Sequence, residues 1–318
     1  MKAAFRSIYG GPEVLSIREM PVPVPKDNEL LIRVHTTTVN RTDCGVLWGK
    51  PFVFRFFTGL FKPRETNAGT DFAGVVEKTG TNVTAFTPGQ RVFGFYDNGC
   101  GSHSTYITFK ESGNITTVPE NTSFEQAAAT AEGGHYAWNF IRKAKMKAGE
   151  QVMVYGATGA IGSAAVQILR YIGATVTAVC NTKNVELTRS LGADKVVDYE
   201  TEDFTKDELR YDHILDAVGK SSFGVCKKLL KPGGKYMSSE LGPGNENIYL
   251  PLFTRWSKKR VIFPFPDNIK DNILFLKKLL EEKKFNPVID RSYPLEQIAE
   301  AFTYVNSGQK TGNVILTY

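Results

Sequence analysis

The sequence predicts a mixed α/β protein in which a β-rich N-terminal domain precedes a doubly wound parallel sheet. Two observations favour this fold class. Residues 1–120 carry β-branched and aromatic runs punctuated by Pro, Gly and Asn, which is typical of antiparallel strands and turns. From residue 151 onward, short apolar runs alternate with helical stretches, which is typical of a parallel sheet with helices on both faces.

The individual elements follow from local patterns. The N-terminal strands are expected at residues 29–40, 72–80, 90–95 and 104–109. Ser123 and Gln126 form a capping-box pattern that predicts the start of a helix over "AAATAEGGHYAWNFI". The six strands of the parallel sheet are expected at residues 151–156, 175–180, 195–199, 213–219, 235–239 and 260–265.

The C-terminal residues do not continue this alternation. A helix is expected at about 268–284, followed by the apolar helical pattern of "YPLEQIAEAFTYVNSG" and a last strand in "NVILTY". We therefore expect three parts, which are a β-rich domain at 1–121, the doubly wound domain at 122–266, and a segment at 267–318 that returns to the first domain. Loops at 44–66 and 240–256 are expected to shape a pocket.

Composition narrows the functional class. The net charge of +6 and the pI near 9.0 favour anionic partners, but Lys and Arg are scattered and the run "KKR" at 258–260 is short, so dedicated nucleic-acid binding is not expected. No apolar run approaches the roughly 20 residues of a membrane span, and "PFVFRFFTGLF" is interpreted as an apolar loop or pocket wall. We expect no membrane partner.

Cysteine usage and the N-terminal residues favour a cytoplasmic location. The first ten residues contain no apolar signal segment. The sequence has no C-x-x-C pair, which argues against a disulfide framework and against a zinc knuckle. The four cysteines are Cys44, Cys100, Cys180 and Cys226.

The stretch "VMVYGATGAIGSAAVQILRYIGA", residues 152–174, is the strongest functional signal. It places glycines in a G-x-x-G-x-x-G pattern between an apolar strand and a helix with one apolar stripe. The N–H groups at the start of such a helix bind a diphosphate, and the glycines allow close approach of phosphate and close packing of the helix. The alternative is a tight turn without a ligand. The expected contacts are Gly156, Ala157, Thr158, Gly159, Ala160, Ile161 and Gly162.

The end of the second parallel strand indicates which dinucleotide binds. An acidic residue about 20 positions after the glycines is typical of NAD, because it binds the ribose 2′-hydroxyl. Here Asn181, Thr182 and Lys183 follow the strand instead. The missing carboxylate and the lysine ammonium favour a 2′-phosphate, and hence NADPH. The alternative for Lys183 is an ordinary solvated lysine.

Several segments resemble the medium-chain dehydrogenase/reductase superfamily, most closely its zinc-free quinone oxidoreductase and enone reductase branch. The resemblance covers essentially the whole chain and implies a GroES-like catalytic domain at 1–121 and a Rossmann NADPH-binding domain at 122–266. The segments are "GTDFAGVV" (69–76), "PGQRVFGF" (88–95), "SFEQAAAT" (123–130), "YGATGAIGSAAVQ" (155–167), "LGADKVVDY" (191–199) and "KTGNVILTY" (310–318).

The resemblance also implies that no catalytic metal is bound. Zinc-dependent members of the superfamily carry a cysteine where this chain has Asn40, and His-Glu where it has Thr70 and Asp71. A third cysteine ligand is missing from the helix "AAATAEGGHYAW". The four-cysteine structural lobe is missing as well.

The mechanism implied by the resemblance is hydride transfer from NADPH to a quinone or an α,β-unsaturated carbonyl. The matched Asn40 lies beside the nicotinamide and positions its carboxamide or the substrate oxygen, while Asp43 is expected to be structural. Trp48 and Phe52, with the "PFVFRFF" loop, are expected to wall the substrate pocket. Tyr136 replaces a threonine that is usual in the family and either donates a proton to the substrate oxygen or only narrows the pocket.

Further site residues carry over by position. His135 is placed in the substrate pocket, with a structural histidine as the alternative. Thr130 is expected near the phosphates or the nicotinamide ribose, and Lys310 near the cleft. The remaining cofactor contacts are Tyr199 near the 2′-phosphate, Val218 and Gly219 under the adenine and its ribose, and Ser239 and Leu241 near the nicotinamide.

The sequence therefore predicts an NADPH-dependent oxidoreductase that forms a homodimer, as its relatives usually do, through the apolar strand "RVIFPF". Two alternatives stay open. One is a zinc-free NADP-dependent alcohol or carbonyl dehydrogenase. The other is an NADPH-binding protein with a non-enzymatic or RNA-binding role.

Overall fold

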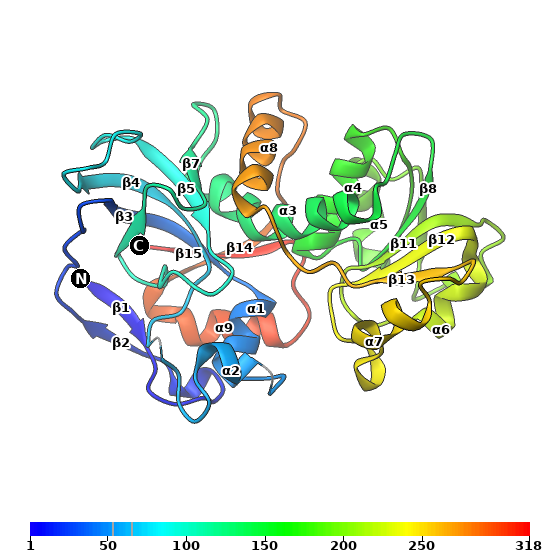
Figure 1. Cartoon of the computed structure of the whole chain (residues 1–318), viewed down its shortest axis with the longest axis horizontal. Helices are drawn as coiled ribbons and strands as arrows, with labels where there is room; N and C mark the ends of the chain where they lie inside the picture. The colour runs from blue at the N-terminus through cyan, green and yellow to red at the C-terminus, as the bar shows by residue number, and fades with distance from the viewer. Residues whose placement is uncertain (53, 65) are drawn as a thin grey trace. The chain divides into compact units, whose positions relative to one another are not determined.

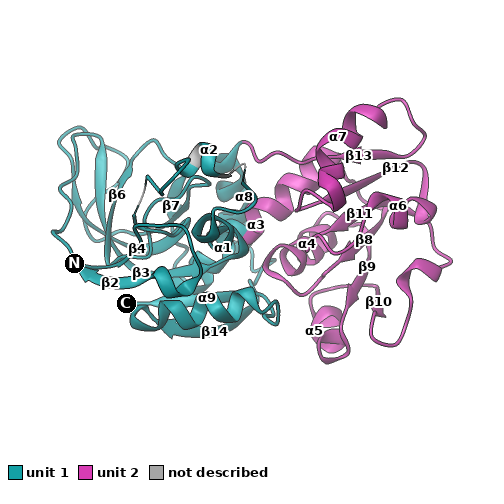
Figure 2. Ribbon diagram, turned by 90° about the horizontal axis from the view of Figure 1, so that it is seen from below, with its two compact units in different colours: residues 1–132, 268–318 teal, residues 133–267 magenta. Residues whose placement is uncertain are grey.

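The computed structural model describes residues 1–52, 54–64 and 66–318, which fall into two compact units (Figures 1 and 2). Unit 1 comprises Met1–Glu132 and Asn268–Tyr318, and unit 2 comprises Gly133–Asp267. The division falls inside one helix, α3 (Phe124–Ala144), whereas the sequence places the domain boundary just before this helix.

Unit 1 is built on a mainly antiparallel sheet. Within the described residues its strand order is β14-β15-β3-β4-β5-β7, and β6 pairs with β3 on the side of this path. Only β14 and β15 are parallel, so the antiparallel pairing expected for the N-terminal strands is confirmed. The strands are β3 (Glu29–Val39), β4 (Asp71–Thr79), β5 (Arg91–Phe95), β6 (Tyr106–Lys110), β7 (Ile115–Thr117), β14 (Ile289–Pro294) and β15 (Asn313–Thr317), with β1 (Lys2–Phe5) and β2 (Ser16–Glu19) in a separate two-stranded sheet.

The C-terminal segment packs against the N-terminal strands. Strand β15 pairs antiparallel with β3, so that Val314 lies opposite Val39. Leu47 and Phe302, from helices α1 and α9, are buried in the same apolar cluster as Val314. Helix α1 begins two residues after the end of β3 at Val39. The helices of unit 1 are α1 (Arg41–Trp48), α2 (Phe54–Thr58), α8 (Ile269–Glu281) and α9 (Ile298–Asn306), with short 3₁₀ helices η1 (Pro12–Val14) and η6 (Leu295–Gln297).

Unit 2 contains a six-stranded, fully parallel sheet in the order β10-β9-β8-β11-β12-β13. Because strand order reverses beside β8, this is the doubly wound arrangement in which ligands bind at the carboxyl ends of the strands. The predicted fold class is therefore confirmed. The strands are β8 (Gln151–Tyr155), β9 (Thr175–Cys180), β10 (Lys195–Asp198), β11 (Tyr211–Asp216), β12 (Leu230–Ser238) and β13 (Arg260–Ile262).

Helix starts in this part of the chain follow local sequence signals. The capping box is present at α3, where the Ser123 N–H donates to Gln126 Oε1 at 3.0 Å and the Gln126 N–H donates to Ser123 Oγ at 3.1 Å. Helix α4 buries the apolar stripe that the sequence predicts after the glycine turn. The helical segments of unit 2 are α4 (Ala160–Tyr171), α5 (Val185–Ser190), α6 (Phe223–Cys226) and α7 (Glu246–Phe253), with 3₁₀ helices η2 (Thr182–Asn184), η3 (Phe204–Lys206), η4 (Lys227–Leu229) and η5 (Pro243–Asn245).

Both segments expected to be loops contain helices, since 44–66 includes the end of α1 and all of α2, and 240–256 includes α7. Gly242, Gly244 and Pro251 favour a loop in the sequence, but Gly244 lies in the turn before α7, and Pro251 is tolerated inside the helix. In the part of the chain that the structure describes, no helix is long and apolar enough to cross a bilayer.

Candidate functional site

The predicted cofactor residues of unit 2 lie along one edge of its sheet. Strands β8 to β12 end at Tyr155, Cys180, Asp198, Asp216 and Ser238, and all of them run parallel, so the segments that follow them share one edge (Figure 1). The structure thus brings together residues that are up to 85 positions apart. These residues are Gly156–Gly162 after β8, Asn181–Lys183 after β9, Tyr199 after β10, Val218 and Gly219 after β11, and Ser239 and Leu241 after β12.

The three glycines after β8 have different roles. Gly156 has a φ of +77°, and a Cβ there would lie 2.6 Å from the Val218 side chain. A Cβ on Gly162 would lie 2.1 Å from the carbonyl oxygen of Gly156, so this glycine allows α4 to pack on the turn. A Cβ on Gly159 would meet nothing closer than 3.9 Å. Two glycines are therefore required by packing, whereas Gly159 faces open space.

The start of α4 fits the diphosphate of a dinucleotide. Gly159 is the N-cap, and its carbonyl oxygen accepts the first helical hydrogen bond from the Ser163 N–H at 2.9 Å. The first N–H groups of a helix have no acceptor within the helix and carry a partial positive charge. The open space at Gly159 leaves room for an anion to reach them.

A residue missed by the sequence analysis, Asp216, organises the turn after β11. This buried carboxylate accepts hydrogen bonds from the N–H groups of Val218 (3.1 Å), Gly219 (2.7 Å) and Ser221 (2.8 Å). Burial raises its pKa, and the three N–H donors oppose that shift. The sequence "HILDAVG" did contain a signal for this role of Asp216, because a carboxylate there ends an apolar strand directly before a glycine turn.

The turn after β9 has acidic neighbours that the sequence did not reveal. The Thr182 hydroxyl donates to Asp198 Oδ2 at 2.6 Å, and the Thr182 N–H donates to Glu200 Oε2 at 3.1 Å. Both carboxylates come from the end of the neighbouring strand β10, while Lys183 is exposed on η2. The β9 segment itself therefore has no carboxylate at this turn, but the β10 segment supplies two.

In unit 1, Asn40 is fixed by a buried network. It caps α1, and its backbone N–H donates to Asp43 Oδ2 at 2.8 Å, which supports the structural role expected for Asp43. The Asn40 side-chain nitrogen donates to Asp71 Oδ2 at 3.2 Å and also to Glu132 Oε2 and Thr38 Oγ1. Asn40 is 4% exposed, so its amide is held almost entirely by protein groups.

Glu132 is the second residue that the sequence analysis missed. It lies in α3, is 5% exposed, and accepts hydrogen bonds from the hydroxyls of Thr42 (2.5 Å) and Thr70 (3.3 Å) in addition to the Asn40 amide. The sequence contains one sign of a special role for Glu132, which is that it is a single carboxylate within the alanine-rich run "AAATAEGG". Such a residue in a buried helix face needs partners, which here come from two other segments.

Burial raises the pKa values of the three acids in this cluster. Burial raises the pKa of Asp43 to about 8, with a further contribution from the charge of Asp71. Burial also raises the pKa of Asp71 to about 6, although its hydrogen bonds with Thr38 oppose the shift. The pKa of Glu132 is raised well above its ordinary value by burial and then by Asp43 and Asp71. Burial lowers the pKa of Lys310 to about 8, against the attraction of Glu132.

The donor set around Asn40 does not fit a catalytic zinc ion. Catalytic zinc sites use three protein ligands drawn from Cys, His and Asp or Glu, and they keep one position open. Here the corresponding groups are an amide, the Thr70 hydroxyl and a carboxylate, and the oxygens of Asp71 already accept hydrogen bonds from Thr37, Thr38 and Asn40. Within residues 1–52, 54–64 and 66–318, no group of three or more His, Cys, Asp or Glu side chains is placed to hold a metal ion.

Other predicted residues lie apart from this network or have local partners. The Thr130 hydroxyl donates to the Gln126 carbonyl within α3 at 2.7 Å. Trp48 ends α1, roughly 12 Å along the helix from Asn40 at its start. Phe52 is exposed and contacts Phe56. In the predicted "PFVFRFF" loop, Val53 and the side chains of Phe54 and Phe57 lie outside the described residues.

Three predicted residues are buried or half-buried. His135 is fully buried and packs edge-on against Tyr136, and burial lowers the pKa of His135 to about 4. A neutral, buried histidine agrees with the structural alternative. Tyr136 is half-buried on α3. Lys310 is half-buried, and its ammonium donates to the Gly312 carbonyl at 2.5 Å.

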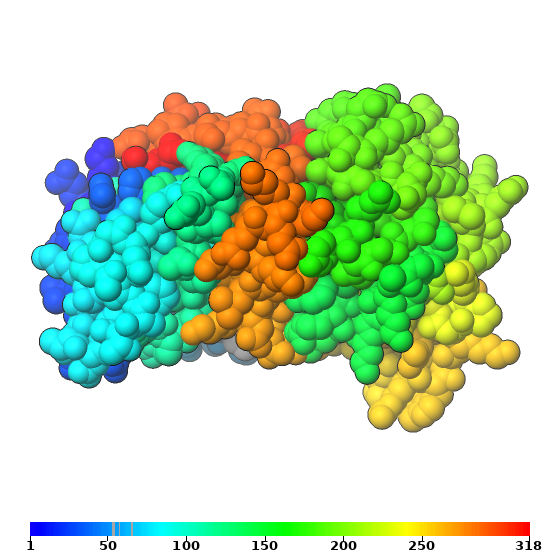
Figure 3. Space-filling model, turned by 90° about the horizontal axis from the view of Figure 1, so that it is seen from above, coloured from blue at the N-terminus to red at the C-terminus, as the bar shows by residue number. Residues whose placement is uncertain are grey.

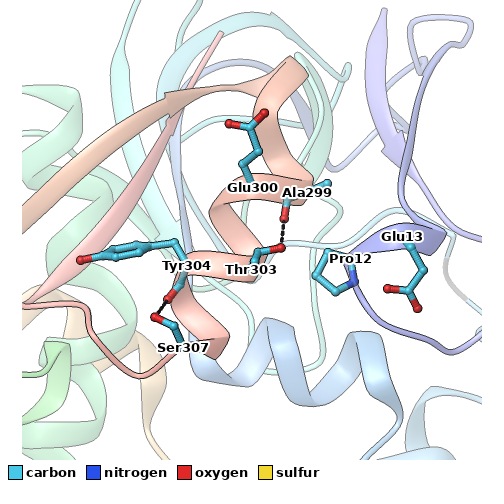
Figure 4. Close-up of a pocket in the computed structure, with 7 residues that line it drawn as sticks. All are labelled: Pro12, Glu13, Ala299, Glu300, Thr303, Tyr304 and Ser307. Atoms are coloured by element: carbon cyan, nitrogen blue, oxygen red, sulfur yellow. Dashed lines mark hydrogen bonds between the residues drawn. The ribbon is translucent and has the colours of Figure 1, made fainter.

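A groove of about 620 Å³ lies elsewhere on unit 1, between η1 and α9 (Figure 4). Its hydroxyls already have protein partners, since Thr303 donates to the Ala299 carbonyl at 2.8 Å, Ser307 to the Tyr304 carbonyl at 2.6 Å and Tyr304 to Asp290 Oδ2 at 2.8 Å. None of the predicted site residues lines this groove. Its lining residues are Pro12, Glu13, Ala299, Glu300, Thr303, Tyr304 and Ser307.

Comparison with known proteins gives the same family for both parts of the chain. The family model described as the alcohol dehydrogenase GroES-like domain matches residues 26–120, and the model described as zinc-binding dehydrogenase matches residues 191–316. The chain belongs to the medium-chain dehydrogenase/reductase superfamily, in its quinone oxidoreductase branch.

Individual relatives agree with this assignment. A 2-methylene-furan-3-one reductase of Solanum lycopersicum is 30% identical over 99% of this chain and 79% of its own length. A chloroplastic NADPH-dependent alkenal/one oxidoreductase of Arabidopsis thaliana has the same identity and coverage. The solved quinone oxidoreductase of Coxiella burnetii superposes with a TM-score of 0.89 at 25% identity, covering 100% of this chain and 99% of its own. The protein is therefore an NAD(P)H-dependent oxidoreductase that acts on a small molecule.

Proposed function

We propose that the protein is an NADPH-dependent reductase of quinones or α,β-unsaturated carbonyl compounds that works without a metal. The proposal rests on one observation. The side-chain amide of Asn40 is held by the buried carboxyl groups of Asp71 and Glu132. Where zinc-dependent relatives provide a cysteine ligand, this chain provides an amide that its neighbours orient. Relatives named for the reduction of a furanone, of alkenals and of quinones support the same reaction class.

The proposed cofactor is NADPH rather than NADH. The diphosphate is proposed to bind the N–H groups from Gly156 to Gly162, and Lys183 is proposed to pair with the 2′-phosphate. Asp198 and Glu200 act against a 2′-phosphate, but hydrogen bonds from Thr182 already engage one oxygen of each carboxylate. The relative named as NADPH-dependent also supports this choice.

The cofactor and the protein have separate roles in the chemical step. When bound, the nicotinamide supplies a hydride to a carbon of the substrate. Negative charge then develops on the substrate oxygen and requires a hydrogen-bond donor or a proton. We assign positioning to Asn40, whose orientation is fixed by Asp71. We assign storage of the proton to Glu132, whose pKa is raised well above its ordinary value by burial. Tyr136 is the second candidate donor.

A substrate panel tests this proposal. Quinones, enones, aldehydes and alcohols are assayed with NADPH and NADH, before and after treatment with a chelator. We expect turnover of quinones or enones with NADPH that the chelator leaves unchanged. Oxidation of alcohols by NADP without turnover of quinones or enones would support the zinc-free alcohol dehydrogenase alternative, whereas loss of activity on chelation would contradict a metal-free reaction. No oxidation of NADPH by any acceptor would support the non-enzymatic alternative.

We also propose a homodimer formed through β13. Within the described residues this strand ends the parallel sheet, and an edge strand can pair with that of a second copy. Light scattering of the purified protein measures the oligomeric state, and a monomer would remove this proposal. The cytoplasmic location remains a prediction, since one of the relatives described above is chloroplastic by name.

A further inference from the structure

Two buried hydroxyl groups of unit 1 adjoin Asp71, and we call them the hydroxyl chain: Thr37 of β3 and Ser102 of the segment between β5 and β6. The Thr37 hydroxyl donates to the carbonyl oxygen of Asp71 at 2.6 Å and to its Oδ1 at 3.1 Å. Ser102 Oγ lies 3.0 Å from Thr37 Oγ1. Both residues are fully buried. The hydroxyl chain is thereby connected to Asn40, whose amide also donates to Asp71.

The direction of the hydrogen bonds in the hydroxyl chain follows from the number of protons. A hydroxyl group has a single proton to donate. Because the Thr37 proton is directed at Asp71, the hydrogen bond between the two hydroxyls uses the Ser102 proton. Ser102 therefore donates to Thr37, and Thr37 donates to Asp71.

The carboxyl group of Asp71 accepts four hydrogen bonds from the described residues. Its Oδ1 accepts from the Thr37 hydroxyl and from the Thr38 N–H at 2.8 Å. Its Oδ2 accepts from the Thr38 hydroxyl at 2.5 Å and from the Asn40 amide at 3.2 Å. Four donors match an ionised carboxylate, which has about four lone-pair sites and no proton of its own. The orientation of the Asn40 amide thus depends on the donors that occupy the other sites of Asp71.

Two further contacts keep Ser102 in place. Gly69 has a φ of +103°, and a Cβ there would lie 2.3 Å from Ser102 Oγ, so a glycine is needed to leave room for this hydroxyl. The Tyr318 hydroxyl donates to the Ser102 carbonyl. Tyr318 follows the buried strand β15, and only small areas of the last residues, coloured red, are visible on the face shown in Figure 3. Ser102 is therefore held by two segments that are distant from each other in the sequence.

We propose that Thr37 and Ser102 are positioning residues, which hold Asp71 and through it keep the Asn40 amide in the orientation that the reaction uses. This inference rests on the proposed role of Asn40. A purely structural role of the two hydroxyls leads to a different expectation, because a loss of packing alone would lower Tm without changing the pH dependence of kcat.

Steady-state kinetics of single and double variants test the proposal. Thr37→Val replaces the hydroxyl by a methyl group of similar size and should lower kcat about 10- to 100-fold, since a small misplacement of a positioning group has an effect of this size. Thr37→Ser keeps the hydroxyl and should restore most of kcat. Ser102→Ala should lower kcat in the same direction, but should have no further effect when added to Thr37→Val, because Ser102 acts through Thr37. The KM for NADPH should not change in any of these variants.

The pH dependence of kcat separates positioning from packing. Burial raises the pKa of Asp71 to about 6, and the hydrogen bonds from Thr38 and Thr37 oppose this shift. Loss of the Thr37 hydroxyl should raise the pKa further, so the decline of kcat toward acid should begin at a higher pH in Thr37→Val than in the wild type. An NMR titration of the Asp71 carboxyl carbon measures the same change without turnover. The other titratable groups beside Asp71 stay in place in all variants, and they are Asp43, Cys100, Glu132 and Tyr318.

Thr36→Val is the matched control, because Thr36 is a buried threonine of β3 whose side chain lies on the opposite face of the strand from Thr37. It should leave kcat, its pH profile and the pKa of Asp71 unchanged. The proposal is overturned if Thr37→Val keeps the wild-type kcat and acid decline, or if Thr36→Val lowers kcat equally. Should Thr37→Val fail to fold, Ser102→Ala decides by the same two measurements. Absence of quinone or enone turnover in the wild type would refute the proposed function, whereas an unchanged Asp71 pKa in Thr37→Val refutes the hydroxyl chain whether or not the protein turns over.

Discussion

Replacing Glu132 by glutamine tests whether this residue stores the proton for the reaction. In the folded protein Glu132 accepts hydrogen bonds from Asn40, Thr42 and Thr70. Glutamine keeps the shape and one acceptor oxygen, but its other terminal atom is an amide nitrogen that cannot take up or release a proton near neutral pH. The substitution therefore separates proton storage from packing.

The expected size of the effect follows from these contacts. One of the three hydrogen bonds is lost, which costs about 1–3 kcal/mol of stability and lowers Tm by a few degrees. If Glu132 supplies the proton, kcat should fall by about 10²- to 10⁴-fold, which is the range for loss of a general acid. The KM for NADPH should stay within about twofold, because Glu132 is not among the proposed nucleotide contacts.

The assay measures kcat and KM for an enone or a quinone between about pH 5 and pH 9. In the wild-type protein, kcat should decline as Glu132 loses its proton, and because burial raises its pKa, this decline should lie well above the ordinary range of a glutamate. The matched control is Glu125→Gln on the same helix, which lies outside the Asn40 network and should leave kcat unchanged. Retention of the wild-type kcat and pH profile by Glu132→Gln would refute the proton assignment.

Further predictions concern the cofactor, the glycine turn and pH. Lys183→Ala should raise the KM for NADPH about tenfold by removing a charged hydrogen bond and leave that for NADH unchanged, and equal effects in steady-state assays would count against the 2′-phosphate site. Gly159→Ala should weaken NADPH binding at least about tenfold in titration calorimetry with little change in Tm, because its Cβ meets only open space. Gly162→Ala should instead destabilise the fold by about 2 kcal/mol or more in denaturant titration, since its Cβ would overlap a backbone oxygen. Asp43 has a folded pKa of about 8 against an ordinary value of 3.8, so wild-type stability should fall as pH rises between these values. Asp43→Asn should flatten this fall in Tm measured against pH, and an unchanged slope would contradict the buried-acid assignment.

The features that the sequence predicts well depend on residues that are close together in the chain. The glycine turn lies between a strand and a helix that adjoin it in the chain, so apolar spacing is enough to define it. The capping box at Ser123 is likewise closed within four residues. Leu241 was assigned through the family resemblance, and the parallel pairing of β8 to β12 explains why it lies at the same edge of the sheet as Gly156.

The features that the sequence analysis missed depend on contacts between distant segments. Glu132 meets Asn40 across 92 positions, and a single carboxylate in a helix gives no sign of which strand end will face it. Asp198 and Glu200 reach Thr182 only because β10 pairs with β9 in one register. Helix α7 was not predicted because Gly242, Gly244 and Pro251 favour a loop. Its apolar residues alone do not distinguish an exposed helix from a core helix.

The chemistry of the Asn40 network bears on which substrates the protein can reduce. A zinc ion stabilises a localised alkoxide by direct charge, and this is what reduction of a simple aldehyde requires. The Asn40 network instead consists of an amide and of carboxyl groups whose pKa values burial raises, so it favours uncharged groups over a metal ion. Neutral donors suffice where the charge on the product is delocalised, as in the enolate from an enone or the anion of a hydroquinone. We therefore expect kcat/KM for enones and quinones to exceed that for saturated aldehydes of similar size by at least about 10²-fold, which is the effect of losing one oxyanion donor in other enzymes. A ratio near one would mean that the Asn40 network does not set the substrate class.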